Sequence, residues 1–176
     1  MIIQSIVIVI VVLIAGILVL AATKPDSFRV QRAAAIKAPP EKIFALIDDF
    51  TAWGSWSPWE KKDPAMKRTF GATTRGKGAA YAWEGNKDVG QGSMEIEEST
   101  PPSTIVLKLD FAKPFEAHNR VEITLAPMGD TTNVTCAMQG PTPFFAKIIN
   151  VFINMDRMVG KDFEAGLANL KAAAEK

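Results

Sequence analysis

Few side chains in this sequence could support nucleophilic, acid–base or metal chemistry. The 176 residues include one histidine, His118, and one cysteine, Cys136, too few for a zinc site built from several such ligands. These two residues could act together as a nucleophile and its base, although neither stands in a sequence context typical of such a pair. We therefore predict no metal site and no cofactor, and we assign no catalytic residue.

The acidic residues that could move a proton are Glu60 and Glu84, each of which directly follows a tryptophan. If Trp83 points to the apolar face of a strand, alternation places Glu84 on the opposite, solvated face. No pair of carboxylates at a fixed spacing, Ser/His/Asp set or phosphate loop is recognisable. The segments Gly76-Lys77-Gly78 and Gly90-Gln91-Gly92 lack the pattern that flanks a phosphate loop, so we interpret them as turns or strand irregularities.

Three of the four tryptophans lie within seven residues, in the stretch WGSWSPWE at positions 53–60. Tryptophan is usually buried, and the glycine, proline and serines between these residues are not typical of a regular strand. In one interpretation, Trp53, Trp56 and Trp59 seal the end of a hydrophobic core. In the other, Trp56 and Trp59 line the mouth of a cavity and contact a ligand. The two interpretations are compatible, because side chains that close the end of a hollow domain also form part of the wall of its cavity.

The charge of the chain is nearly balanced, at a formal +1. The composition therefore shows no excess of basic residues for binding a phosphate backbone, and we expect no nucleic-acid partner. The apolar fraction is 48%, and much of the excess lies at the N-terminus.

Residues 1–23 are predicted to form a transmembrane anchor. The segment 2–22 carries no charge, and about twenty helical residues span roughly 30 Å, the thickness of the hydrocarbon core of a bilayer. A soluble core helix would show a polar face, which this segment lacks. A cleavable signal peptide is the main alternative, but the apolar run exceeds the usual ~7–15 residues and no basic residue precedes it. We expect a single-pass protein that contacts the membrane through residues 2–22.

Residues 24–27 are polar and include a proline, so we interpret them as a short linker before a domain at 28–176. The basic residues that follow the apolar segment are Lys24, Arg29, Arg32 and Lys37. Under the positive-inside rule, this bias places the domain in the cytoplasm.

The domain is predicted to be an α+β fold. Between residues 28 and 140, about seven segments alternate apolar and polar residues, which is typical of an antiparallel sheet with one face in water. Two short helices are expected after the first of these strands, one starting near Pro39 and one in the tryptophan stretch. From Pro143 to Ala174 apolar residues recur with the helical period, which predicts one amphipathic helix of about 30 residues, broken or bent near Gly160. The sheet can bury its apolar face by curving around this helix.

Several short motifs accompany this order of elements. They are APPEKIF at 38–44, WSPWE at 56–60 followed by Asp63-Pro64, YAWEGN at 81–86, GQG at 90–92, FEA at 115–117 and MDRMVGKDFE at 155–164. Over about residues 25–176 the chain resembles the START-like (SRPBCC) superfamily, which has the helix-grip fold, and within it a membrane-anchored bacterial branch of polyketide cyclase/dehydrase-like proteins. The resemblance implies a cavity for a hydrophobic ligand between the sheet and the long helix, although a fold does not by itself name a function.

The expected lining of this cavity combines the apolar strand face with the apolar stripe of the long helix. Asn119 is the polar exception, and a buried amide must bond to backbone, to water or to a polar group of the ligand. The predicted ligand-binding residues are Trp56, Trp59, Tyr81, Trp83, Met94, Leu107, Leu109, Asn119, Val121, Met138, Phe145, Ile149, Phe152 and Met155. Plain core packing is the alternative role for each of them.

Three functions fit these observations. The first is a membrane-anchored binding module for a hydrophobic small molecule, such as a lipid or an isoprenoid. The second is an enzyme of the polyketide cyclase/dehydratase type, which needs an ionisable or strongly polar group inside the cavity, such as Asn119, Tyr81 or Glu60. The third is a solid-cored domain that acts through protein contacts. The sequence makes no prediction of oligomeric state.

Overall fold

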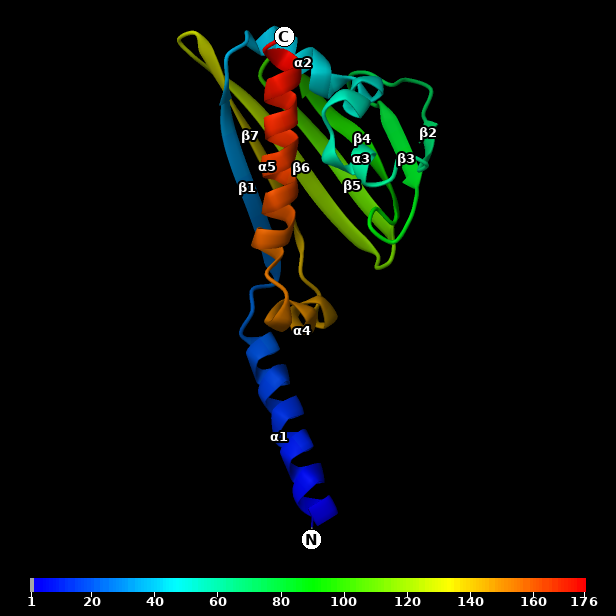
Figure 1. Cartoon of the computed structure of the whole chain (residues 1–176), viewed down its shortest axis with the longest axis vertical. Helices are drawn as coiled ribbons and strands as arrows, with labels where there is room; N and C mark the ends of the chain where they lie inside the picture. The colour runs from blue at the N-terminus through cyan, green and yellow to red at the C-terminus, as the bar shows by residue number, and fades with distance from the viewer. Residues whose placement is uncertain (1) are drawn as a thin grey trace.

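The computed structural model of the chain describes residues 2–176; Met1, the first residue of the predicted anchor, lies outside the described residues. Figure 1 shows an N-terminal helix that projects from one end of an α+β domain. The elements in chain order are α1 (Ile2–Ala22), β1 (Ser27–Ile36), α2 (Pro40–Asp48), the 3-10 helix η1 (Phe50–Ser55), α3 (Pro58–Lys62), β2 (Lys67–Phe70), β3 (Ala80–Glu84), β4 (Gln91–Thr100), β5 (Thr104–Lys113), β6 (Ala117–Met128), β7 (Thr131–Pro141), α4 (Phe144–Phe152) and α5 (Met155–Ala174).

Over residues 2–176, seven strands form one antiparallel sheet in the order β1-β7-β6-β5-β4-β3-β2. Strands β2 to β7 pair with their neighbours in sequence, and β1 pairs with β7, so the first strand joins the last. The sheet curves around α5 (Figure 1). This arrangement confirms the predicted α+β, helix-grip fold with a seven-stranded sheet.

Side-chain alternation decides which face of the sheet is buried. On β6, for example, Val121, Ile123 and Leu125 are buried, while Arg120 on the other parity is exposed. The inward face packs against α2 and α5, whose buried side chains include Ile43, Ile47, Leu167 and Leu170. Removing this apolar surface from water is the main stabilising contribution to the domain.

The C-terminal helix differs from the sequence prediction. One helix from Pro143 to Ala174 with a break or bend near Gly160 was expected, but the chain forms two helices, α4 and α5, with the break at Ile153 and Asn154. The side-chain Oδ1 of Asn154 accepts a hydrogen bond from the backbone N–H of Arg157 at 2.9 Å, which makes Asn154 the N-cap of α5. Gly160 is buried within the uninterrupted α5. The interruption was therefore predicted at the wrong residue: the helix is broken, but at the capping residue Asn154 and not at Gly160.

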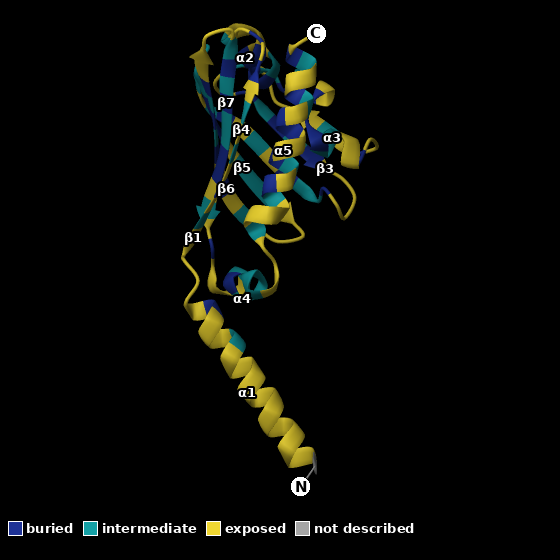
Figure 2. Cartoon of the chain, turned by 60° about the vertical axis from the view of Figure 1, so that its left-hand side comes forward, coloured by how far each residue is buried: buried dark blue, intermediate teal, exposed yellow. Residues whose placement is uncertain are grey.

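The two helices have different partners. α5 packs along β1, whereas α4 packs against α1 at the end of the domain (Figures 1 and 2). Within the described residues, one helix, at Ile3–Ala22, is long and apolar enough to cross a membrane. A signal sequence near the N-terminus would meet the same criterion, so the helix could be an anchor or a signal.

Candidate ligand-binding cleft

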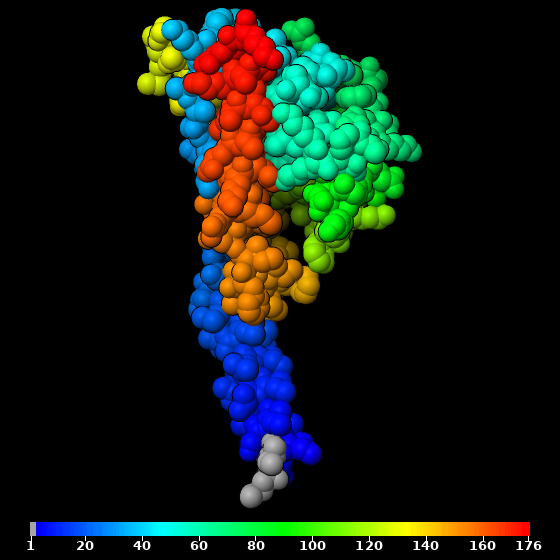
Figure 3. Space-filling model, in the orientation of Figure 1, coloured from blue at the N-terminus to red at the C-terminus, as the bar shows by residue number. Residues whose placement is uncertain are grey.

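The inward face of the sheet is only partly covered by helices. α5 lies mainly over β1, and the segment from α2 to α3 lies over the end of the sheet near the C-terminus (Figure 1). Between them the molecule is hollowed, beside α5 and next to the region of α3 and β3 (Figure 3). We call this hollow the cleft. The apolar side chains that are half-buried and pack against the core include Phe28, Met94, Leu109, Phe111 and Cys136 from the strands, and Trp59 and Val159 from the helices.

Asn119 is the polar group in this apolar wall. It lies on the inward face of β6, opposite Leu109 of β5, and is 9% exposed. Within residues 2–176, its side-chain amide makes no hydrogen bond. Gly140 leaves room for this amide, since a Cβ at position 140 would collide with Oδ1 of Asn119. Among residues 2–176, the buried side-chain polar atom without a partner is Oγ1 of Thr142, not an atom of Asn119. The Asn119 amide therefore still reaches solvent, and an accessible amide among apolar side chains is suited to bind a polar group of a ligand.

Two open hollows in the surface have volumes of about 730 and 300 Å³. The larger includes Phe28, Asn119 and Gly140 at the end of the sheet near α4, together with side chains of the outer face such as Lys108 and Gln139. The smaller lies along the outer face of β2 to β5. An enclosed cavity between the sheet and the helix therefore stays a prediction, and the half-buried wall with Asn119 is what supports it.

The structure places the predicted ligand-binding residues in three groups. Those packed in the core are Trp56, Tyr81, Trp83, Leu107, Val121 and Met138, with Asn119 beside them. Trp59, Met94 and Leu109 are half-buried and pack against the core. The four helix residues, Phe145, Ile149, Phe152 and Met155, were expected to point back at the sheet. This expectation is wrong for Phe145 and Phe152, which are 62% and 71% exposed, because α4 turns away from the sheet towards α1.

The tryptophans divide between the two roles considered for them. The indole N–H of Trp53 donates to the carbonyl of Ile47 at 2.9 Å, and that of Trp56 donates to the carbonyl of Leu46 at 2.9 Å. These carbonyls belong to the last turn of α2, whose acceptors lack partners within the helix. Trp53 and Trp56 thus cap α2 and seal the core. Trp59 instead is half-buried and packs edge-on against Phe163 of α5, with ring centroids 6.4 Å apart.

Glu60, one of the acids considered for proton transfer, is half-buried. Its Oε2 accepts from Nε of Arg68 at 2.6 Å, and its Oε1 accepts from the hydroxyl of Tyr81 at 2.7 Å. Burial, followed by the adjacent Glu60 carboxylate, raises the pKa of Tyr81 above its usual value. The hydrogen bond to Glu60 raises the pKa of Arg68. The cluster ties α3 to β2 and β3, and it leaves no oxygen of Glu60 without a protein donor.

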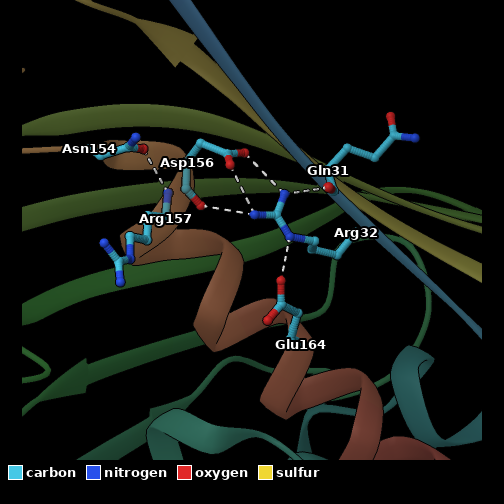
Figure 4. Close-up of polar contacts among 6 residues, drawn as sticks. All are labelled: Gln31, Arg32, Asn154, Asp156, Arg157 and Glu164. Carbon is cyan, nitrogen blue, oxygen red and sulfur yellow. Dashed lines mark hydrogen bonds and ion pairs between the residues drawn. The ribbon is translucent and has the colours of Figure 1, made fainter.

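Arg32 is a charged residue on the inward face of β1, beneath α5 (Figure 4). Its Nε donates to Glu164 at 2.7 Å, and Nη1 and Nη2 each donate to a carboxylate oxygen of Asp156 at 3.0 Å. Nη1 also donates to the carbonyl of Gln31, and Nη2 to that of Asp156. Arg32 has the same strand parity as Val30 and Ala34, so sequence alternation assigns it to the face that they share. Alternation does not identify its partners, which lie 124 and 132 residues further along the chain.

Cys136 and His118 cannot form a catalytic pair. Cys136 lies on the inward face of β7, and burial raises the pKa of its thiol to about 12, so the thiol stays protonated. His118 lies on the outer face of β6, where its Nδ1 is 2.7 Å from Asp110. The hydrogen bond with Asp110 raises the pKa of His118. Within the described residues, no group of three His, Cys, Asp or Glu side chains is arranged to hold a metal ion.

Comparisons with known proteins agree with this architecture. The family described as polyketide cyclase / dehydrase and lipid transport matches residues 27–175. A search of curated proteins finds no match. Among solved structures, protein CV1439 from Chromobacterium violaceum aligns with a TM-score of 0.60 at 16% identity, over 87% of this chain and 99% of its own. Protein jhp0584 from Helicobacter pylori aligns with a TM-score of 0.65 at 10% identity, over 86% and 90% of the two chains.

A third similar structure is DynU16, a protein of the dynemicin biosynthetic locus. It aligns with a TM-score of 0.58 at 14% identity, over 87% of this chain and 48% of its own. At such identities the structural likenesses show the fold alone.

Proposed function

Because the chain belongs to the polyketide cyclase/dehydrase and lipid transport family, we propose that it is a membrane-anchored binding module for a hydrophobic small molecule. The ligand is of the lipid or isoprenoid class and occupies the cleft between the sheet and α5. The helix α1 is an uncleaved anchor, and the domain faces the cytoplasm.

The observation that best supports this proposal is the environment of the Asn119 side chain. A side chain amide that is 9% exposed and makes no hydrogen bond among residues 2–176 stands in a wall of apolar side chains. An apolar site with one or a few placed polar groups is the usual composition of a small-molecule site. The ligand we propose is therefore mostly apolar and carries one hydroxyl, carbonyl or similar group, which meets Asn119.

The enzymatic alternative is a cyclase or dehydratase that acts on a hydrophobic substrate in the same cleft. It requires a group that can exchange a proton with the substrate. Glu60 is held on both oxygens, by Arg68 and Tyr81, and burial and Glu60 together oppose ionisation of Tyr81. These contacts favour binding over catalysis.

The test is to identify what the full-length protein carries. The protein is extracted from cells in native nanodiscs, and its bound molecules are compared by mass spectrometry with the total lipids of the same membranes. We expect one compound to be enriched at near-stoichiometric amount. Recovery of lipids in the proportions of the bulk membrane would contradict the proposal.

Two variants show whether the compound occupies the cleft. Asn119→Leu keeps the size of the side chain and removes the amide, so the loss of one hydrogen bond of about 1.4 kcal/mol should lower retention of the compound about tenfold. Asn133 lies on β7 at the outer-face parity, and Asn133→Leu is the matched control, expected to retain the compound. Equal retention by both variants would exclude Asn119 from the site.

A further inference from the structure

The helix α4 has its polar and apolar sides reversed relative to a helix on a water-soluble domain. Its buried residue is Lys147. Phe144, Phe145 and Phe152 are 50%, 62% and 71% exposed. At the helical period, these phenylalanines share one side of α4 with Ile148 and Ile149, and Lys147 lies on the other side. A helix with this orientation exposes its apolar face to whatever surrounds the domain.

The buried lysine holds α4 in that orientation. The ammonium of Lys147 lies 2.5 Å from the carboxylate of Asp26, in the linker between α1 and β1. The backbone N–H of Thr142, just before α4, donates to the carbonyl of Asp26 at 2.7 Å. The linker therefore fixes the polar side of α4 to the domain, and the aromatic side cannot turn inwards without breaking this ion pair.

Most of the large exposed apolar side chains of the domain lie at this end of the molecule. After α1, the large exposed apolar side chains are Phe70, Phe115, Met128, Phe144, Phe145, Phe152, Ile153 and Met158. All except Phe70 and Met128 belong to α4, the α4–α5 connection, the start of α5 or the β5–β6 connection. Phe115, from that connection, lies against Phe145 with ring centroids 6.0 Å apart, so the connection extends the face of α4. We call Phe115 with the exposed side of α4 the aromatic face.

The position of the aromatic face along α1 indicates what covers it. α4 packs against α1, and Ile17 and Ala21 are the described side chains of α1 that are not exposed. At 1.5 Å per residue, Ile17 lies about 8 Å from the end of the apolar helix at Ala22. Amphipathic helices at a membrane surface insert their apolar side about 5–10 Å into the boundary between headgroups and acyl chains.

We propose that the aromatic face is immersed in the headgroup and acyl-chain boundary of the same bilayer that holds α1. The proposal rests on the proposed anchor, because α1 sets the depth of α4. It gives the buried Lys147 and the exposed phenylalanines one explanation, since lipid rather than water surrounds the apolar side. It also places the end of the cleft near Phe28 and Phe111 close to the membrane, so a lipid-soluble ligand could enter the cleft from the bilayer.

The test measures depth in the membrane for the full-length protein. In a Cys136→Ala background, single cysteines replace Phe145, Phe152, Leu13 or Met128, and each is labelled with the fluorophore NBD. The proteins are reconstituted in phosphatidylcholine vesicles with and without lipids that carry a nitroxide quencher on the acyl chain. Leu13 reports on the anchor, and Met128, exposed at the β6–β7 turn, is the control on the domain.

We expect the probes at 145 and 152 to lose most of their fluorescence to the quencher and to show blue-shifted emission, while the probe at 128 is unaffected. If the probes at 145 and 152 resemble the probe at 128 while the probe at 13 is quenched, the aromatic face lies in water and the proposal is wrong, although the anchor stands. If the probe at 13 also escapes quenching, the anchor fails, and this proposal fails with it.

A charge substitution gives an independent readout. Phe145→Glu with Phe152→Glu puts two carboxylates on the aromatic face, where they are exposed and leave the core intact. We expect the quenching of a probe at Phe115→Cys to be lost in this variant. Phe70→Glu, at an exposed site on β2, is the control and should leave that quenching unchanged. Quenching that persists after both substitutions on α4 would contradict the proposal.

Discussion

Gly160 of α5 lies directly against the guanidinium of Arg32, so closely that a Cβ at position 160 would overlap it. The contact lets α5 approach β1 while Arg32 reaches Asp156 and Glu164 on either side of the glycine (Figure 4). Arg32 lies on the inward face of β1, next to the buried apolar side chain of Val30. The clamp therefore joins the first strand of the domain to the helix that closes its cleft.

Gly160→Ala should lower the free energy of unfolding by about 1–3 kcal/mol, because the added methyl group forces the Arg32 clamp apart. Helix propensity alone predicts a gain of about 1 kcal/mol from the same change. The measurement is denaturant unfolding of the full-length protein in detergent. Gly166→Ala in the same helix is the control, since its Cβ would make ordinary contacts of 3.4 Å and longer, and it should be neutral or stabilising. Two variants of equal stability would show that the clamp tolerates the methyl group.

The clamp should also make stability depend on pH in the acid range. The hydrogen bond from Arg32 lowers the pKa of Asp156 in the folded protein. The unfolded chain therefore binds a proton first as the pH falls, and the contribution of Asp156, present at neutral pH, should be lost below about pH 4. Denaturation of wild type and Asp156→Asn between pH 7 and pH 3 measures this. The two stability curves should converge at low pH, and a constant difference would contradict the assignment.

The protein has a single tyrosine, so its phenolate absorbance reports on Tyr81 without overlap from another tyrosine. Burial and the Glu60 carboxylate raise the pKa of Tyr81, and we expect no ionisation at about pH 10, where an ordinary tyrosine is half ionised. Glu60→Gln removes the negative charge and should lower this pKa, while burial still keeps it above the usual value. A midpoint near pH 10 in the folded wild type would show that the Glu60–Tyr81 contact does not persist in solution.

Substitution of two nearby tryptophans should separate stability from binding. Trp56→Phe removes the donor to the Leu46 carbonyl and leaves that acceptor unsatisfied, at a cost of about 1–3 kcal/mol in unfolding free energy. The indole of Trp59 donates no hydrogen bond among the described residues, so Trp59→Phe should cost about 1 kcal/mol or less. Trp59→Phe should instead lower retention of the bound molecule. If both variants lost stability equally, Trp59 would belong to the plug and not to the cleft.

The strands were predictable because apolar and polar residues alternate along each of them, and this alternation identifies the buried face. The parity of Val121, Ile123 and Leu125 identifies the inward face of β6 without knowledge of any other strand. The same rule placed Glu84 outwards, and this position agrees with the structure. The apolar helix at the N-terminus was equally clear, since twenty residues without charge leave few alternatives.

The site was harder to predict because an apolar period does not identify the partner of an apolar face. Phe145 and Phe152 continue the stripe of α5 in sequence, yet they lie on a separate helix that packs on α1. The signal for that separation was Asn154, a residue that prefers helix N-caps, within a stretch that otherwise reads as one helix. Asn119 could be identified as a polar exception from sequence, but its lack of a partner depends on every neighbouring strand.

The order of elements, the inward and outward faces and the apolar N-terminal helix follow from the sequence alone, because each depends on residues a few positions apart. Tertiary structure decided which tryptophans cap α2, which partners hold Arg32 and Glu60, and where the aromatic side of α4 points. These contacts join groups that are tens of residues apart in sequence. The orientation of α4 also depends on its packing against α1. The physical reason is that local periodicity specifies that a face is apolar, whereas long-range packing specifies what covers it.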